Sequence, residues 1–334
     1  MTALVARREL RLAETVVAPA YQALTAESLL GLQEGERIKV RDLLYGLLLV
    51  SGNDAAVALA QAASSSEQAF VEEMNQTAQH LGLDHTSYAN PIGLDEEGNF
   101  SSAEDLATLA ARLERDSFFR RVFDTSETTI ESGATPRTLL NRNVLVRTVP
   151  YVTGVKTGYT LNAGNVLVGS AERDGVELVS AVLGAPTESD RDAGTLALLN
   201  YGFSLYEKRK PVRKGEPLAE LTIRNRELAV ALEATEDLAV TVRRGQRVEV
   251  SVNAPAQADG PIAKGERIGK ARVVVDGREV ATVPLAAARS AAAASLVERY
   301  DAAVPGSRVV AWLVAVAALA FVFVGGLVIW DRCR

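Results

Sequence analysis

The sequence predicts an α+β domain, with helices and an antiparallel sheet, followed by a small all-β domain and a C-terminal transmembrane helix. Three observations predict this fold class. Residues 1–205 carry helical patterns and then a β-hairpin signature, residues 210–285 alternate apolar and polar side chains, and residues 309–330 carry no charge.

The first 205 residues repeat apolar side chains at helical spacing, with short polar stretches between the repeats. This spacing predicts helices over residues 41–50, 54–63, 67–81, 103–115 and about 192–201. Residues 166–170 and 176–183 are instead rich in β-forming side chains. The Asp174-Gly175 pair between them is typical of a hairpin turn, so these residues form two antiparallel strands.

Residues 210–285 predict a separate, small, all-β domain. Valines alternate with polar residues on both sides of Arg243-Arg244-Gly245, and Asp276-Gly277 lies between two further valine-rich segments. Residues 286–308 are rich in alanine, and we expect them to form a connector rather than part of a core.

The run from Val309 to Trp330 is a candidate transmembrane helix. Its 22 residues carry no charge, and at about 1.5 Å per residue they span roughly 30 Å, the thickness of a bilayer core. Trp312 and Trp330 lie near the two ends, where interfacial aromatic residues are common. A buried helix of a soluble protein is the alternative, but charges bound the run closely. Arginines on both sides leave the orientation open.

Composition excludes several classes of protein. The chain carries 36 Lys+Arg against 42 Asp+Glu, a net charge of −6, with no long basic run, which argues against nucleic acid as its main partner. Two histidines and one cysteine cannot build a usual Cys/His zinc site, so no metal is expected. A single cysteine also excludes an intrachain disulfide.

Two short motifs carry residue types that serine acyl-transfer chemistry uses. Ser51-Gly52-Asn53 lies between two predicted helices, and Lys156-Thr157-Gly158 lies beside β-rich sequence. Each has an ordinary structural explanation when taken alone, as a helix cap and turn or as an exposed strand end. Together they match two of the three motifs, S-x-x-K, S-x-N and K-T-G, of penicillin-binding and β-lactamase-type enzymes.

The chemistry accounts for these residue types. Ser51 can relay a proton, and Asn53 can form a hydrogen bond with a substrate amide. Lys156 supplies positive charge for a substrate carboxylate, and Thr157 supplies a hydroxyl contact. Gly158 leaves space for a substrate along the strand edge. Ser51 and Asn53 are therefore candidate catalytic residues, and the other three are candidate substrate-binding residues.

The chain resembles the D-alanyl-D-alanine carboxypeptidases of peptidase family S11, the low-molecular-mass penicillin-binding proteins. The resemblance runs from Met1 to about Phe203, and residues 210–285 more weakly resemble the C-terminal domain often appended to these enzymes. Four segments carry it: Leu30–Ala60, Leu81–Asp95, Gly154–Val168 and Val182–Phe203.

The resemblance implies a penicillin-binding/β-lactamase-like transpeptidase fold and removal of the terminal D-Ala from peptidoglycan stem peptides through an acyl-serine intermediate. It implies no cofactor, and β-lactam antibiotics as covalent inhibitors of the complete enzyme. It also implies membrane lipid as a partner, because residues 309–330 would anchor the protein to the outer face of the cytoplasmic membrane.

One feature departs from the family pattern. The S-x-x-K motif, which carries the nucleophile and its general base in the family, is missing, and so is a signal peptide. We expect the chain as given to start late, through a mis-assigned start or a truncation, and to be inactive in this form. The alternatives are a non-catalytic, membrane-anchored cell-wall binding protein and a β-lactamase-like hydrolase.

Overall fold

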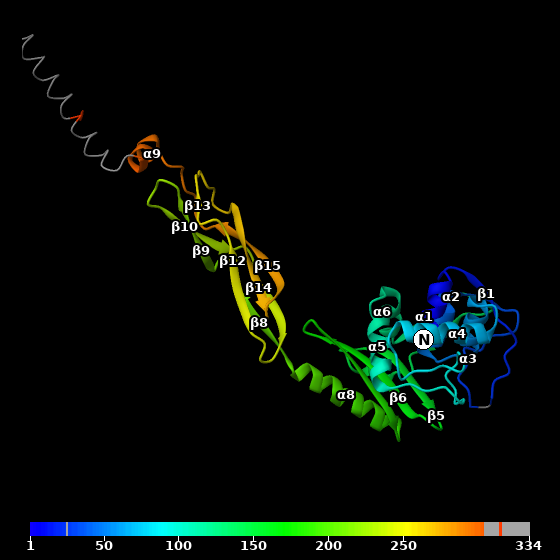
Figure 1. Cartoon of the computed structure of the whole chain (residues 1–334). Coiled ribbons are helices and arrows are strands. Elements are labelled where there is room, and N and C mark those ends of the chain that lie inside the picture. Colours follow the sequence, from blue (N-terminus) through cyan, green and yellow to red (C-terminus); the bar gives the residue numbers. More distant parts are fainter. Residues whose placement is uncertain (25, 304–313, 316–334) are drawn as a thin grey trace, which may run out of the picture. The chain divides into compact units, whose positions relative to one another are not determined.

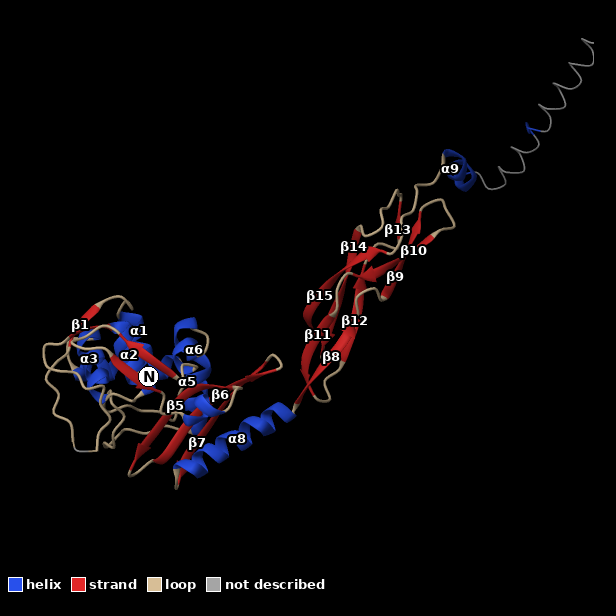
Figure 2. Cartoon of the chain, turned by 180° about the vertical axis from the view of Figure 1, so that it is seen from behind, coloured by secondary structure: helices blue, strands red, loops and turns tan. Residues whose placement is uncertain are grey.

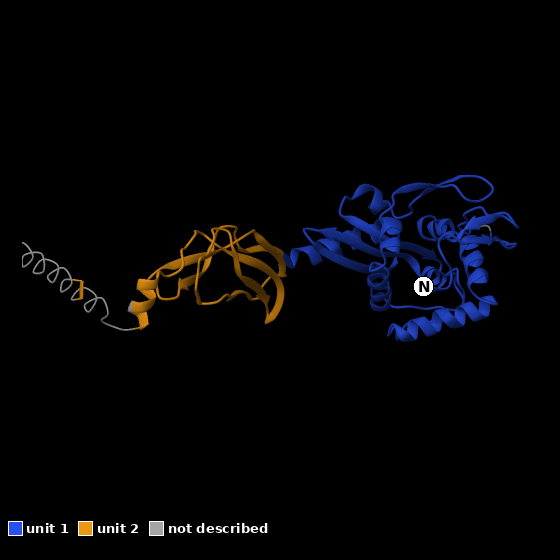
Figure 3. Ribbon diagram, turned by 90° about the horizontal axis from the view of Figure 1, so that it is seen from above, with its two compact units in different colours: residues 1–206 blue, residues 207–334 orange. Residues whose placement is uncertain are grey.

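The computed structural model describes residues 1–24, 26–303 and 314–315. The chain divides into two compact units, Met1–Tyr206 and Glu207–Arg334, which Figure 3 colours separately. Helices and strands both build the first unit, whereas strands dominate the second (Figure 2). Each unit has a hydrophobic core of its own.

The predicted helices of the first unit are confirmed, with ends shifted by a few residues (Figure 1). The structure adds two short helices, α6 and α7, that the sequence analysis did not predict, and begins with a helix, α1. The described helices of this unit are α1 (Thr2–Glu9), α2 (Val40–Leu49), α3 (Asn53–Ala63), α4 (Glu67–His80), α5 (Ala103–Leu113), α6 (Ser117–Phe123), α7 (Val144–Thr148) and α8 (Glu188–Ser204).

A three-stranded antiparallel sheet in the order β5-β6-β7 forms the centre of the unit. The predicted hairpin is confirmed as β6–β7, and its turn residues Asp174 and Gly175 both have positive φ angles, 54° and 77°. Two small antiparallel pairs, β1–β2 and β3–β4, lie outside the sheet. The strands are β1 (Thr15–Val17), β2 (Arg37–Lys39), β3 (Glu127–Ile130), β4 (Arg137–Leu140), β5 (Val152–Thr160), β6 (Gly164–Arg173) and β7 (Val176–Ala185).

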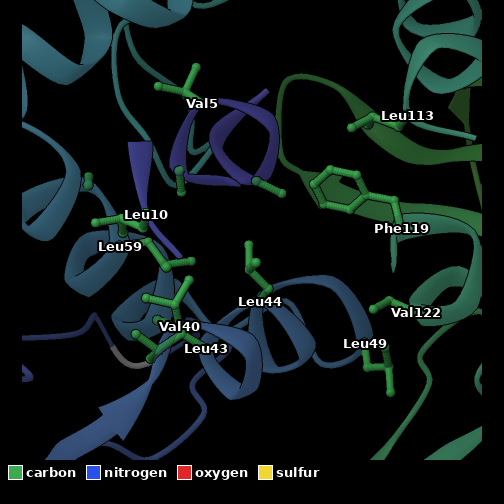
Figure 4. Packing of buried hydrophobic residues seen from close by; sticks show 14 of the residues in the cluster. Val5, Leu10, Val40, Leu43, Leu44, Leu49, Leu59, Leu113, Phe119 and Val122 are labelled. Atoms are coloured by element: carbon green, nitrogen blue, oxygen red, sulfur yellow. The ribbon is translucent and has the colours of Figure 1, made fainter. Parts of the chain in front are cut away.

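The two faces of this sheet pack against different helices. Val168 belongs to a large core formed with α1 to α6, whereas the neighbouring Leu167 belongs to a smaller core with Leu199 and Phe203 of α8. This alternation is what a strand requires, because successive side chains point to opposite faces. Figure 4 shows the large core, in which side chains such as Leu44 and Phe119 come from separate helices.

The second unit is the all-β domain that the sequence predicts. A six-stranded sheet in the order β12-β14-β15-β10-β9-β13 accompanies a two-stranded pair, β11–β8. The predicted hairpin at Asp276-Gly277 is confirmed, because Val275 pairs with Arg278 across it. The strands are β8 (Tyr206–Val212), β9 (Pro217–Ile223), β10 (Ala229–Ala234), β11 (Leu238–Arg243), β12 (Val248–Asn253), β13 (Gln257–Ala258), β14 (Arg267–Val275) and β15 (Arg278–Ala287).

The segment expected to form a connector, residues 286–308, is in part built into this domain. β15 continues to Ala287, and Ala291 forms a bridge with Ile262. Both alanines are buried in the domain core, because their small side chains fit against the sheet. Within the same segment, α9 spans Leu296–Ala303.

The membrane span expected at residues 309–330 lies outside the described residues, apart from residues 314 and 315. In the part of the chain that the structure does describe, no helix has both the length and the apolar character needed to cross a bilayer.

Candidate active site

Ser51-Gly52-Asn53 forms the tight connection between α2 and α3. Ser51 has a φ of 62°, a left-handed conformation that is unfavourable for a residue other than glycine and that is concentrated at functional sites. Glycine suits position 52, because a Cβ there would lie 3.0 Å from the backbone nitrogen of Leu30, closer than most Cβ contacts. The backbone N–H of Gly52 donates to Gly46 of α2. The motif is therefore held rigidly at the start of α3.

The carboxylate of Asp54 ties this connection to the loop that precedes β2. Asp54 is 4% exposed and accepts hydrogen bonds from three consecutive backbone N–H groups of that loop, at 2.8 to 2.9 Å. The three donors are those of Leu30, Gly31 and Leu32. A buried carboxylate with this many donors holds the loop against the start of α3.

The second motif lies on β5, the edge strand of the three-stranded sheet. Lys156 pairs with Val168 of β6, whose side chain points into the large helical core. Paired residues of antiparallel strands share a face of the sheet, so the register directs Lys156 toward the helices and Ser51. A Cβ at Gly158 would meet nothing nearer than Val166 at 3.8 Å, so no close contact within the chain requires glycine there.

The fold brings the two motifs into contact. The Nζ atom of Lys156 donates to Oγ of Ser51 at 2.9 Å, across 105 positions of sequence, and to the backbone oxygen of Thr157 at 2.7 Å. All five predicted site residues line one cavity of about 1140 Å³, namely Ser51, Asn53, Lys156, Thr157 and Gly158. The sequence predicted these residues as candidates, and the tertiary structure places them in one cavity.

Two arginines add positive charge to the same cavity. Burial, together with the charges of Arg142 and Arg191, lowers the pKa of Lys156 to about 8. Both arginines line the cavity, and the Arg191 side chain is only 4% exposed, with Nε donating to Asp192 at 2.9 Å. Lys156, Arg142 and Arg191 supply the positive charge that would bind an anionic group such as a carboxylate, while Glu27, Asp95 and Glu188 also line the cavity.

Sequence reasoning missed both arginines and also Glu27. Arg142 follows β4, and Arg191 lies in the first turn of α8, so no spacing relates either of them to Lys156. Glu27 lies in the loop between β1 and β2 and accepts a hydrogen bond from the Asn53 side-chain amide at 2.9 Å. The one available signal was the acidic start of α8, where Glu188, Asp190 and Asp192 lie close to Arg191 in the sequence.

A metal centre has no support in this cavity. Among the residues that the structure describes, no three His, Cys, Asp or Glu side chains come together in a way that could hold a metal ion.

Comparisons with known proteins agree with the fold and the cavity. Residues 1–187 match the family described as D-alanyl-D-alanine carboxypeptidase, peptidase S11, and residues 206–292 match the C-terminal domain of penicillin-binding protein 5. A crystal structure of penicillin binding protein 5 from Haemophilus influenzae is similar, with a TM-score of 0.58 and 30% identity over 87% of this chain and 89% of that chain. The fold and the two motifs thus define a transpeptidase domain of the penicillin-binding type, followed by a β domain.

Curated relatives narrow the class further. The D-alanyl-D-alanine carboxypeptidase DacF of Bacillus subtilis (strain 168) is 32% identical over 284 residues, 84% of this chain and 73% of DacF. DacA of Haemophilus influenzae, a D-alanyl-D-alanine carboxypeptidase, is 34% identical over 257 residues, 75% of this chain and 64% of DacA. The chain belongs to peptidase family S11, the D-alanyl-D-alanine carboxypeptidases, which confirms the resemblance and the expected enzyme class. The roles of the individual site residues stay predictions.

Proposed function

We propose that this protein recognises peptidoglycan stem peptides that end in D-Ala-D-Ala, the substrates of a serine-type carboxypeptidase. The observation that carries the proposal is the contact between Lys156 Nζ and Ser51 Oγ inside a cavity that Arg142 and Arg191 also line. The cationic groups would bind the C-terminal carboxylate of the peptide. The peptide would then lie along the edge of β5, past Thr157 and Gly158.

In this arrangement the two motifs have separate roles. Lys156 and Thr157 hold the carboxylate and Asn53 forms a hydrogen bond with the peptide backbone, while in a form that carries the nucleophile Ser51 relays a proton toward the leaving amine. The hydrogen bond from Lys156 supports the relay role, because it keeps Ser51 Oγ in one place and orients its remaining proton.

Acyl transfer also needs a serine nucleophile with a nearby base. No serine in the 334 residues is followed by a lysine three positions later, so the family's S-x-x-K motif is not among them. We therefore expect the 334-residue polypeptide to bind the peptide without cleaving it, since loss of a serine nucleophile costs on the order of 10⁶ in kcat in a comparable hydrolase. This observation also favours a second candidate function, a non-catalytic cell-wall binding protein.

Labelling with a fluorescent penicillin tests the catalytic part. We expect no covalent adduct with the polypeptide as given, and a stable adduct with a form that carries S-x-x-K before Met1. β-Lactams would in that case be inhibitors of the complete enzyme. Labelling of the 334-residue chain would show that it holds a working nucleophile, whereas failure of the extended form to react would favour the binding protein.

Titration with an N-acyl-D-Ala-D-Ala peptide, followed by calorimetry, tests the carboxylate site. The protonated amine binds the carboxylate, so affinity should be constant below the Lys156 pKa of about 8 and fall as the pH rises through it. Lys156→Ala should weaken binding about tenfold or more, because a charge-assisted hydrogen bond with the carboxylate is lost. Lys39→Ala is the matched control, because Lys39 is an exposed lysine of the same unit. Equal effects of the two substitutions would contradict the proposal.

We also propose that residues 309–330 anchor the protein in the cytoplasmic membrane as a single span, with the bulk of the chain on the outer, cell-wall side. The support is the uncharged run of 22 residues with a tryptophan near each end. In this orientation Cys333 lies in the cytoplasm. A membrane-impermeant maleimide applied to intact spheroplasts should therefore leave Cys333 unlabelled and label Ser251→Cys, a substitution on the exposed face of β12. The reverse pattern would show the opposite orientation.

A further inference from the structure

The loop between β1 and β2 places a carboxylate on the Asn53 amide. Oε2 of Glu27 accepts a hydrogen bond from Asn53 Nδ2 at 2.9 Å, and the Tyr21 hydroxyl donates to the same oxygen. The other carboxylate oxygen, Oε1, accepts from the backbone N–H of Leu24 at 2.9 Å. Glu27 and Asn53 both line the cavity, and the roles so far assigned to the two motifs make no use of Glu27.

The loop is bound tightly to the residues around Asn53, so this contact is part of the local framework. The backbone N–H of Asn53 donates to the Ser28 oxygen at 2.8 Å. Asp54, the next residue, binds the N–H groups of residues 30–32. The Glu27 carboxylate is therefore held by the Leu24 N–H, and the next residue, Ser28, binds the backbone of Asn53.

The chemistry of the pair sets one orientation of the amide. An ionised carboxylate has acceptors only, whereas an Asn side chain has a donor end and an acceptor end. A half-turn of the amide would bring Oδ1 against the carboxylate and lose the hydrogen bond, which costs more where the groups are buried. Asn53 is 6% exposed. The Nδ2 end must stay on the Glu27 side as long as Glu27 is ionised.

We infer that Glu27 is a positioning residue, which fixes the Asn53 side-chain amide in one orientation and so sets the donor and acceptor pattern that the cavity presents to a peptide backbone. The effect on a bound peptide rests on the proposed function. Burial raises the pKa of Glu27, but the hydrogen bonds from Asn53, Tyr21 and the Leu24 N–H outweigh it and lower the pKa overall. Glu27 is thus ionised at neutral pH and releases the amide only in acid.

Nuclear magnetic resonance of the Asn53 side-chain NH₂ group tests the positioning directly, with no ligand present. In the wild-type chain both NH₂ resonances should shift as Glu27 is protonated, with a midpoint below the ordinary value for a glutamate. Glu27→Gln should abolish this titration, because glutamine does not titrate, and its amide, which can both donate and accept, permits either orientation of Asn53. Glu34→Gln, which changes an exposed glutamate of the same loop, should leave the titration unchanged. Tyr21→Phe should also keep it, because the contact between Glu27 and Asn53 remains.

Binding of an N-acyl-D-Ala-D-Ala peptide tests the consequence. Glu27→Gln should weaken binding roughly three- to tenfold, with no change in its dependence on pH near 8, which belongs to Lys156. Glu34→Gln should bind as the wild type does. If the wild-type chain binds no peptide, the proposed function fails, while the resonances of Asn53 still decide the positioning role. A wild-type amide that does not titrate, or Glu27→Gln behaving as Glu34→Gln does, would overturn the inference.

Discussion

The two units of the chain use buried groups in different ways. Among the residues that the structure describes, every buried polar or charged side chain lies in the first unit. The second unit buries apolar side chains, for example Leu221, Val230 and Val273, each fully inaccessible to solvent. The first unit holds the cavity.

Three buried aspartates of the first unit share one role. Asp54, Asp42 and Asp105 each accept hydrogen bonds from backbone or hydroxyl groups of a loop distant in sequence. Burying such a group is unfavourable unless it is paired, but a paired group is directional, whereas apolar packing is not. The comparison therefore indicates that buried carboxylates hold loops of the first unit, among them loops that line the cavity, whereas the buried side chains of the second unit contribute apolar packing.

The largest effect that we expect in this comparison comes from Asp54→Ala. Its removal leaves three backbone N–H groups without their acceptor and should lower the free energy of unfolding of the first unit by about 4 kcal/mol. Urea unfolding measures the change. Asp237→Ala is the control, because Asp237 of the second unit also accepts a backbone N–H, from Lys214, but is exposed, so a much smaller loss is expected. Similar losses in the two variants would contradict the contrast between the two units.

A cavity in the β core should have the next largest effect. Leu221→Ala removes a fully buried side chain of β9 and should lower the free energy of unfolding of the second unit by about 3 kcal/mol. The loss is one of packing, so peptide binding at Lys156 should be unchanged. Calorimetry of unfolding and of binding on the same variant checks both statements, and a binding defect would show that the two units are not independent.

Acid should weaken the first unit through Glu36. Burial by itself raises the pKa of Glu36, but the hydrogen bonds from Arg137 and from the backbone N–H groups of Gln33 and Ala134 lower it to about 2. A lowered carboxyl pKa stabilises the fold above the ordinary value of 4.5, and that contribution is lost as the pH falls from 4.5 toward 2. The whole contribution of this shift to the free energy of unfolding is about 3 kcal/mol.

Comparison of wild type and Glu36→Gln checks this prediction. Urea unfolding of the first unit at pH 6 and at pH 3 should show a smaller dependence on pH in the variant, because glutamine does not titrate. An unchanged dependence would assign the acid sensitivity to other carboxylates.

Local patterns predicted most of the secondary structure, because residues close together in the sequence already show the periodicity of a helix or a strand. The helices α2 to α5 and α8 and both Asp-Gly hairpins agree with the predictions. The short helices α6 and α7 did not follow from the sequence, since each has fewer than eight residues and too few turns to show a period. The end of the β domain was also missed, because alanines at 287 and 291 suit a connector and a core equally well.

The residues of the site also divide into those that the sequence identified and those that only the structure revealed. Ser51, Asn53 and Lys156 were identified from the sequence, because their motifs combine residue types that a known chemistry needs. Arg142, Arg191 and Glu27 were not, since each stands in a different element with nothing local to connect it to a cavity.

The sequence by itself determined the longer helices, the two Asp-Gly hairpins, the two motifs and the family. Only the tertiary structure decided that Lys156 meets Ser51 across 105 positions, and that Glu27 meets Asn53. The physical reason is that such contacts depend on the register of β5 against β6 and on a loop held by Asp54. Both result from packing and hydrogen bonds between residues far apart in the chain, which no local spacing encodes.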